Sequence, residues 1–212
     1  RVLVVDRDAG AAEVSARLAG EAGGDAVAHP ADVTDDAQVA GYVRAAEERW
    51  GGVDGFFNNA GIASGAGPLD SPIEEWQTQW DVNLMSHVHA IREVLPAMLK
   101  RGSGYILHTA SMAGILSSHG NLPYAVSKHA VVGLAEWMAF TYQHTGVKTS
   151  LLAPLVVRTP MLGNAADSAW ATQAGGPLKE PEDAANYVVD AINEERFLIL
   201  TDEIAQTWME RK

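Results

Sequence analysis

The sequence predicts an α/β fold built on a doubly wound parallel sheet. Short β-rich runs alternate along the chain with longer segments of helical periodicity, and polar residues gather just after several of these runs. Strands that alternate with helices of this length are typical of βαβ units, whose parallel sheet is covered on both faces. A length of 212 residues with 47% hydrophobic content suits one packed domain. We therefore expect residues 1–212 to form a single domain.

Each expected strand is a short apolar or β-branched run bounded by polar or turn residues. The runs are RVLVV at 1–5, AVAH at 26–29, VDGFFN at 53–58, YILHTA at 105–110, KTSLLA at 148–153 and RFLIL at 196–200. Right-handed crossovers make such strands point the same way, so their carboxyl ends line one edge of the sheet. Ligands bind along that edge.

The expected helices lie between these strands, and most have recognisable starts. They cover residues 9–20, 35–50, 72–99, 122–144 and 181–193. Thr34 or Asp35 can cap the second helix, and Ser71 precedes Pro72 and two glutamates at the start of the third. Pro123 suits the first turn of the fourth because it has no N–H to leave unpaired. The stretch AGGPLKEPED at 174–183 indicates a loop.

Composition excludes several classes of function. The chain has no cysteine, which excludes disulfides and thiolate catalysis and fits a reducing compartment. The net charge is −12 without a basic run, which argues against a nucleic-acid partner. No apolar run approaches the roughly 20 residues that span a bilayer, and the first residues do not resemble a signal peptide. We expect a cytoplasmic protein with no membrane partner.

Polar and small residues follow the expected strands at the edge where ligands bind. They are Asp6 after the first strand, Asp32 and Val33 after the second, NNAG at 58–61 after the third, Ser111 after the fourth and APLVVRT at 153–159 after the fifth. Several coincidences with one predicted edge indicate a site more strongly than any single motif does.

Tyr124 and Lys128 lie four positions apart in NLPYAVSKHA, at the start of an expected helix. Residues at i and i+4 are neighbours on a helix surface. An ammonium beside a phenol favours the phenolate, so we expect Lys128 to lower the pKa of Tyr124 toward working pH, where it can exchange a proton. The alternative is a chance pair on a solvated helix.

With Ser111 thirteen residues before Tyr124, NNAG at 58–61 and Asn83 in DVNLMS, the chain resembles the classical short-chain dehydrogenases/reductases. The resemblance runs from residue 1 to about residue 203 and implies a Rossmann-like sheet. It implies a catalytic tetrad in which Tyr124 is the acid/base and Ser111 holds the substrate oxygen. Lys128 would bind the nicotinamide ribose, and Asn83 would anchor a water in a proton relay.

The resemblance also implies a dinucleotide cofactor. Asp6 is the acid expected to accept hydrogen bonds from the adenosine ribose, and its charge would repel a 2′-phosphate, so NAD is favoured over NADP. Arg7 is a complication, because it could hold that phosphate if it turned inward. The remaining expected contacts are Asp32 and Val33 at the adenine, Asn59, Ala60 and Gly61 beside the ribose, and Pro154 and Thr159 near the nicotinamide, with Tyr124 and Lys128 shared.

The sequence departs from the family pattern in two places. The family has a strand and a glycine-rich TGxxxGxG turn about thirty residues before the acid that matches Asp6. The strand would lie between those at 1–5 and 53–58, so we expect the 212 residues to be a truncated, cleaved or otherwise incomplete form that binds dinucleotide weakly or not at all. Leu155 stands where the family usually has glycine after Pro154, and we expect it to narrow the pocket near Thr159.

Three functional hypotheses follow. The first is an NAD-dependent dehydrogenase that interconverts a secondary alcohol and a ketone, the second a catalytically silent binding or scaffold subunit of the same fold, and the third an NADP-linked ketoreductase.

We expect no metal, because only His87 and His89 cluster and a helix points them to different faces. An apolar substrate is indicated by Ala113, Ile115, Leu122, Leu155, Met161, Leu162 and Trp170. Apolar positions on 72–99 and 122–144 predict a homodimer or homotetramer.

Overall fold

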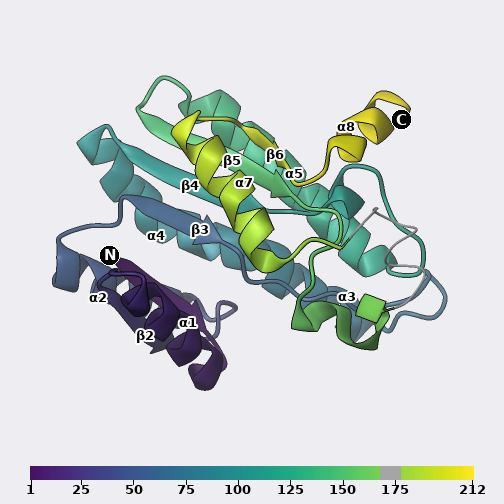
Figure 1. The fold of residues 1–212 in the computed structure, drawn as a ribbon, viewed down its shortest axis with the longest axis horizontal. Helices are drawn as coiled ribbons and strands as arrows, with labels where there is room; N and C mark the ends of the chain where they lie inside the picture. The colour runs from purple at the N-terminus through teal and green to yellow at the C-terminus, as the bar shows by residue number, and fades with distance from the viewer. Residues whose placement is uncertain (168–177) are drawn as a thin grey trace.

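The computed structural model describes residues 1–167 and 178–212, and within them strands and helices alternate as expected (Figure 1). The strands are β1 (Val2–Asp6), β2 (Ala26–Pro30), β3 (Gly55–Asn58), β4 (Gly104–Thr109), β5 (Val147–Ala153) and β6 (Leu198–Leu200). The α-helices are α1 (Ala9–Glu21), α2 (Asp36–Trp50), α3 (Ile73–Trp80), α4 (Ser86–Arg101), α5 (Leu122–Tyr142), α7 (Pro181–Asn193) and α8 (Glu203–Glu210). Helix α8 is an addition to the predicted elements.

Shorter helical turns complete the chain. They are η1 (Asp81–Met85), a turn of π-helix, and the 3-10 segments η2 (Met112–Gly114) and η3 (Pro160–Asp167). The single helix expected over 72–99 is therefore α3, η1 and α4 in succession, with Pro96 inside α4. Part of the loop expected at 174–183 lies outside the described residues, and α7 begins at Pro181.

All strand pairs in the described residues are parallel, which confirms the fold class. The strands form two sheets, one of order β1-β2 and one of order β3-β4-β5-β6. A cavity of about 650 Å³ separates them and is lined by β1 on one side and β3 on the other. The family pattern places a further strand between these two segments, and the cavity lies where that strand is expected.

Helices cover both faces of the four-stranded sheet, and neighbouring residues of β5 show it. Leu151 packs in a cluster with Val131 and Ala135 of α5, whereas Leu152 packs with Ala191 of α7. Successive strand residues point to opposite faces, so α5 and α7 lie on opposite sides, as Figure 1 also shows. The doubly wound arrangement is confirmed.

Of the two side-chain caps predicted from the sequence, the one for α2 is confirmed and the one for α3 is wrong. Asp8 caps α1, and Asp35, not Thr34, caps α2 by accepting hydrogen bonds from Ala37 N and Gln38 N. Helix α3 has no side-chain cap. The Ser71 hydroxyl instead accepts a hydrogen bond from Ala66 N at 2.8 Å, so Ser71 fixes the preceding loop.

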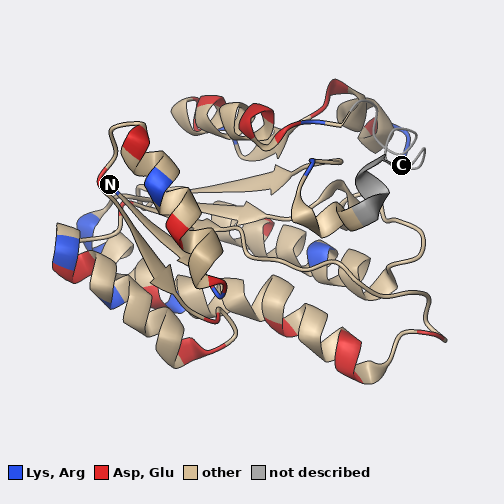
Figure 2. Ribbon diagram, turned by 60° about the horizontal axis from the view of Figure 1, so that its bottom comes forward, with Lys and Arg blue, Asp and Glu red and all other residues tan. Residues whose placement is uncertain are grey.

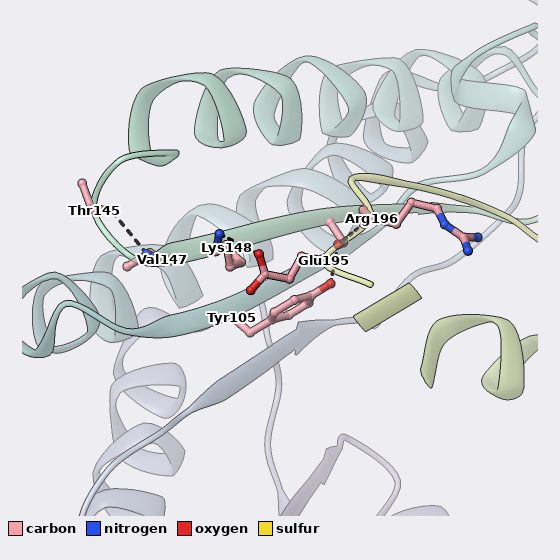
Figure 3. A network of polar contacts seen from close by, with 7 residues as sticks. Tyr105, Thr145, Val147, Lys148, Glu195 and Arg196 are labelled. Carbon is pink, nitrogen blue, oxygen red and sulfur yellow. Dashed lines mark hydrogen bonds and ion pairs between the residues drawn. The ribbon is translucent and has the colours of Figure 1, made fainter. Parts of the chain in front are cut away.

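Polar contacts at the amino ends of β4 and β5 tie these strands to the turn before β6 (Figure 3). Ser150 Oγ donates to Arg196 O at 2.6 Å, so the Tyr105 hydroxyl must be the donor in its 2.5 Å contact with Ser150 Oγ. Lys148 and Glu195 form an ion pair beside them, which is 2.7 Å long and mostly exposed. This network closes the end of the sheet remote from the candidate site.

Charged residues are spread along the helices and loops in the view of Figure 2. The net charge of −12 is therefore not confined to one patch of that view. Among the helices of the described ranges, none combines the length and apolarity that a bilayer crossing requires.

Candidate active site

The four side chains predicted to be catalytic come from three parts of the fold. Asn83 lies in η1, Ser111 stands two residues after the end of β4, and Tyr124 and Lys128 lie in the first turns of α5. The side chains of Ser111 and Tyr124 are neighbours, and Ser111 acts to lower the pKa of Tyr124. The structure therefore brings together the serine and the tyrosine that the resemblance pairs, although thirteen residues separate them.

Gly114 explains how Ser111 can approach Tyr124. A Cβ atom at Gly114 would lie 2.5 Å from the Lys128 carbonyl oxygen, closer than Cβ atoms pack against backbone. Only glycine therefore allows η2 to lie directly on α5, and η2 begins immediately after Ser111. The extended Ser111 also caps η2, since its Oγ accepts a hydrogen bond from Ala113 N at 3.1 Å.

Lys128 is fully buried, with 2% of its surface exposed. Its Nζ donates to the Thr109 carbonyl oxygen at 2.8 Å and lies 5.9 Å from the centre of the Tyr124 ring. Burial lowers the pKa of Lys128 to about 8, because the interior disfavours the charged ammonium. A Cβ at Gly61 would lie 3.3 Å from both Lys128 Nζ and Asn83 Oδ1, so Gly61 packs against two members of the tetrad.

The net shift of the Tyr124 pKa in this structure is upward, opposite to the expected direction. Burial raises the pKa of Tyr124, and the hydrogen bond with Ser111 opposes that rise. The reason is geometric: the ammonium is bonded to Thr109 O, and its distance from the phenol ring leaves desolvation as the larger effect. Tyr124 is thus held as a neutral phenol, the proton-donating form.

Asn83 is buried in the π-turn, and its side chain has protein partners on every side. Oδ1 accepts from Ile62 N at 2.8 Å, while Nδ2 faces Ile62 O at 3.0 Å, Gln79 Oε1 at 2.8 Å and Ser127 Oγ at 3.0 Å. π-turns inside helices occur frequently at functional sites. Because the side-chain amide is occupied, a water predicted at Asn83 has to bind another of its atoms.

The residues predicted to hold the adenosine half of a cofactor lie at or just after the ends of β1, β2 and β3 and border the cavity in which a further strand is expected. Its lining includes Asp6, Arg7, Asp32, Val33, Asn59, Ala60 and Gly61. Asp6 is exposed, with Oδ1 accepting from Asp8 N at 2.9 Å. Hydrogen bonds from the Thr34 backbone and hydroxyl lower the pKa of Asp32, so this carboxylate stays charged. Carboxylate acceptors here and the buried ammonium of Lys128 suit the hydroxyls of two riboses.

The segment after β5 is less closely tied to the tetrad. Pro154 O accepts a hydrogen bond from Met112 N at 3.0 Å, which links this segment to η2. Leu155 packs in an apolar cluster with Met112, Ile115 and Met209. Thr159 is half-buried, and no described contact joins it to the tetrad. Trp170, another predicted substrate neighbour, lies outside the described residues.

Two buried histidines form a pair that sequence reasoning missed. His87 of α4 and His108 of β4 approach through their Nδ1 atoms at 3.1 Å, and both Nε2 atoms lack a hydrogen-bond partner among the described residues. Burial lowers the pKa of His87, and the same effect lowers the pKa of His108 to about 4, so both rings are neutral. Within the described ranges, no three metal-ligating side chains come together.

Comparison with known proteins agrees with this geometry. A family model described as short chain dehydrogenase matches residues 1–170. Levodione reductase of Leifsonia aquatica is 41% identical over 135 residues, and D-beta-hydroxybutyrate dehydrogenase of Rhizobium meliloti (strain 1021) is 34% identical over 149 residues. These matches cover 63% and 70% of this chain and 51% and 58% of the two relatives, so the chain spans little more than half of their length.

A solved structure is similar over nearly the whole chain. It is the crystal structure of a short chain dehydrogenase/reductase from Burkholderia phymatum in complex with NAD. The TM-score is 0.88 at 30% identity, and the match covers 99% of this chain and 83% of the other.

Proposed function

The chain belongs to the short chain dehydrogenase family, and we propose that it interconverts a secondary alcohol and a ketone by hydride transfer with a nicotinamide cofactor. The observation that carries the proposal is the close approach of the Ser111 and Tyr124 side chains next to a buried Lys128. A phenol and a hydroxyl that meet in this way can both bind one substrate oxygen.

In the proposed reduction, Tyr124 gives its proton to the carbonyl oxygen of the ketone, and in the oxidation it takes the proton of the alcohol. Its raised pKa favours the neutral phenol that the reduction needs. Ser111 donates a hydrogen bond to the same oxygen and stabilises the charge that develops there. The nicotinamide, when bound, supplies or accepts the hydride at the carbon.

Lys128 and Asn83 support this chemistry from the interior. The Lys128 ammonium has one described partner, Thr109 O, and three N–H groups, so it can also donate to ribose hydroxyls. Its positive charge below about pH 8 favours the phenolate that forms when Tyr124 gives up its proton. Asn83 holds the Ile62 backbone and so fixes the segment that begins with Gly61.

We further propose NAD as the cofactor. Asp6 lines the cavity and is exposed, so its carboxylate can accept from ribose hydroxyls and repel a 2′-phosphate. The similar protein from Burkholderia phymatum was crystallised with NAD, which supports the same choice. Arg7 lies in the same lining and is the residue that could favour NADP.

Replacing Asp6 tests this choice of cofactor. Asp6→Ala should reduce the preference for NAD over NADP by about tenfold or more, because a charge-assisted hydrogen bond and a repulsion are both lost. The ratio of kcat/KM for the two cofactors measures the effect. Glu13→Ala, an exposed acid on α1, is the matched control. An unchanged ratio in Asp6→Ala would show that Asp6 does not contact the ribose.

We propose an apolar substrate. Ile115 and Leu155 belong to the cluster beside Ser111, and Leu122 precedes Tyr124 by two residues. A screen of secondary alcohols and ketones of increasing apolar size, followed by nicotinamide absorbance, tests both the reaction and the substrate class. Turnover confined to highly polar alcohols would contradict the apolar assignment, and no turnover of any alcohol or ketone would contradict the reaction.

We also propose that the chain forms a homodimer or homotetramer in the cytoplasm. Trp137 and Phe140 of α5 are 58% and 78% exposed, large values for apolar side chains on one helix. A second copy packed against α5 would bury them. The absence of cysteine in the sequence supports a reducing compartment.

Light scattering tests the assembly. We expect a mass at least twice 22.6 kDa at micromolar concentration. Replacing Phe140 by Glu should shift the protein to the monomer, because a charge would be buried at the interface. Val189→Glu, at a 56% exposed apolar position on α7, is the control. A monomeric wild-type mass would contradict the proposal.

A further inference from the structure

Gln79 is a fully buried amide in a helix whose neighbouring residues are exposed. It lies at the end of α3, is 0% exposed, and stands four residues before Asn83. Gln77 and Thr78, beside it in the same helix, face solvent. A polar side chain is buried at little cost only when its hydrogen-bonding groups are satisfied, so the partners of Gln79 indicate what it does.

The partners of Gln79 belong to the segments that build the active site. Its Oε1 accepts from Asn83 Nδ2 at 2.8 Å, and its Nε2 donates to Ser64 O at 3.0 Å and Ser64 Oγ at 2.7 Å. Both N–H groups and the carbonyl oxygen are therefore used. Gln79 connects the tetrad asparagine to the segment that follows Gly61.

The Ser64 segment continues to the start of α5. Ala66 O accepts a hydrogen bond from Leu122 N at 3.0 Å. Gly65 has a φ of +109°, and a Cβ there would lie 3.1 Å from Pro123 Cδ. The segment that Gln79 holds thus contacts α5 immediately before Tyr124.

The direction of these hydrogen bonds fixes the orientation of two amides. Ser64 O can only accept, so it holds the Nε2 side of Gln79 toward itself and leaves Oε1 facing Asn83. Gln79 Oε1 can only accept in turn, so it holds Nδ2 of Asn83 toward itself. Oδ1 is then left to accept from Ile62 N, and a flipped Asn83 would set oxygen against oxygen at Gln79 and at Ile62 O.

We propose that Gln79 is a positioning residue for the active site. It acts through Asn83 and Ser64 and holds Asn83, the Gly61–Ala66 segment and the start of α5 in one arrangement. The expected effect on kcat rests on the proposed function. The expected effect on the orientation of Asn83 rests on hydrogen bonding alone. Nothing in the tetrad motif points to this position, although its spacing of four from Asn83 places both on one helix face.

The kinetic test replaces Gln79 by Met, which keeps the length of the side chain and removes its hydrogen bonds. We expect kcat to fall by about ten- to a hundredfold with little change in KM, because the groups that bind substrate remain and their alignment is lost. Gln77→Met, on the exposed side of α3, should leave kcat unchanged. Wild-type kcat in Gln79→Met would overturn the proposal, whereas no turnover in the wild type would instead count against the proposed function.

The pH dependence of kcat in Gln79→Glu distinguishes a loss of hydrogen bonding from a loss of packing. A protonated carboxyl can donate to Ser64 O and accept from Asn83, whereas a carboxylate cannot donate. Burial raises the pKa of a carboxyl, so relative to wild type this variant should regain kcat as the pH is lowered. A constant ratio to wild type at all pH values would overturn the proposal.

The structural test does not depend on turnover. In the wild type, the Asn83 side-chain amide should give separate, slowly exchanging proton resonances by NMR, because both N–H groups are bonded and buried. In Gln79→Met these resonances should exchange faster, while those of Gln77→Met match the wild type. Equal exchange in the wild type and Gln79→Met would show that Asn83 is positioned without Gln79.

Discussion

Replacing Tyr124 by Phe should reduce turnover by about 10²- to 10⁴-fold, the range that general acid/base catalysis contributes. The substitution removes only the hydroxyl that interacts with Ser111 and that would exchange a proton with the substrate. The phenyl ring keeps its packing, and Lys128 keeps its bond to Thr109 O, so cofactor affinity should remain close to that of the wild type. Steady-state kinetics together with a cofactor titration measure both effects.

The matched control is Tyr187→Phe. Tyr187 lies on α7, is 39% exposed and is remote from the tetrad, so loss of its hydroxyl should leave turnover unchanged. A fall in rate specific to Tyr124→Phe would tie the chemistry to this one hydroxyl. An undiminished rate in Tyr124→Phe would contradict the proposed acid/base role of Tyr124.

The second large effect is a loss of stability at acidic pH, which we expect from the buried His87–His108 pair. In the unfolded chain a histidine has a pKa near 6.5, and in the fold burial lowers that of His108 to about 4. Between these two pH values His108 is protonated in the unfolded state and neutral in the folded state. The free energy of unfolding therefore falls as the pH decreases through this window, by about 1.4 kcal/mol for each pH unit and about 3 kcal/mol in all.

Urea denaturation at a series of pH values between about 6.5 and about 4 measures this loss. Replacing both histidines by leucine removes the titrating pair without leaving one ring unpaired, so the double variant should show a flatter dependence. His119→Leu, at an exposed position, should keep the wild-type slope. Parallel curves for the wild type and the double variant would show that the pair does not account for acid sensitivity.

Regular structure was largely predictable because periodicity is a local property. The helix at 181–193 has the predicted bounds, and each strand lies within two residues of its expected range. The π-turn at Asp81–Met85 could not be predicted, since five residues in an otherwise helical pattern do not distinguish i+5 from i+4 bonding. Helix α8 was not predicted, because its eight residues are too few to show a helical periodicity. The end of the strand before it was predicted correctly.

The site was predictable where it depends on spacing and not where it depends on packing. The tetrad motif led to Ser111 and Tyr124, whose side chains lie close together. The pKa direction of Tyr124 was not accessible, because it depends on burial and on where the Lys128 ammonium points. The roles of Gly114 and Gln79 also depend on neighbours that are distant along the chain.

Transfer of a deuterium label tests the proposed reaction most directly. Secondary alcohols deuterated at the carbinol carbon are incubated with the protein and NAD, and the nicotinamide is analysed by mass spectrometry. The account predicts that deuterium appears in the reduced nicotinamide, that none is lost to water, and that the rate falls in Tyr124→Phe. Reduced nicotinamide without deuterium, or no reduction in a protein shown by calorimetry to bind NAD, would contradict hydride transfer from an alcohol.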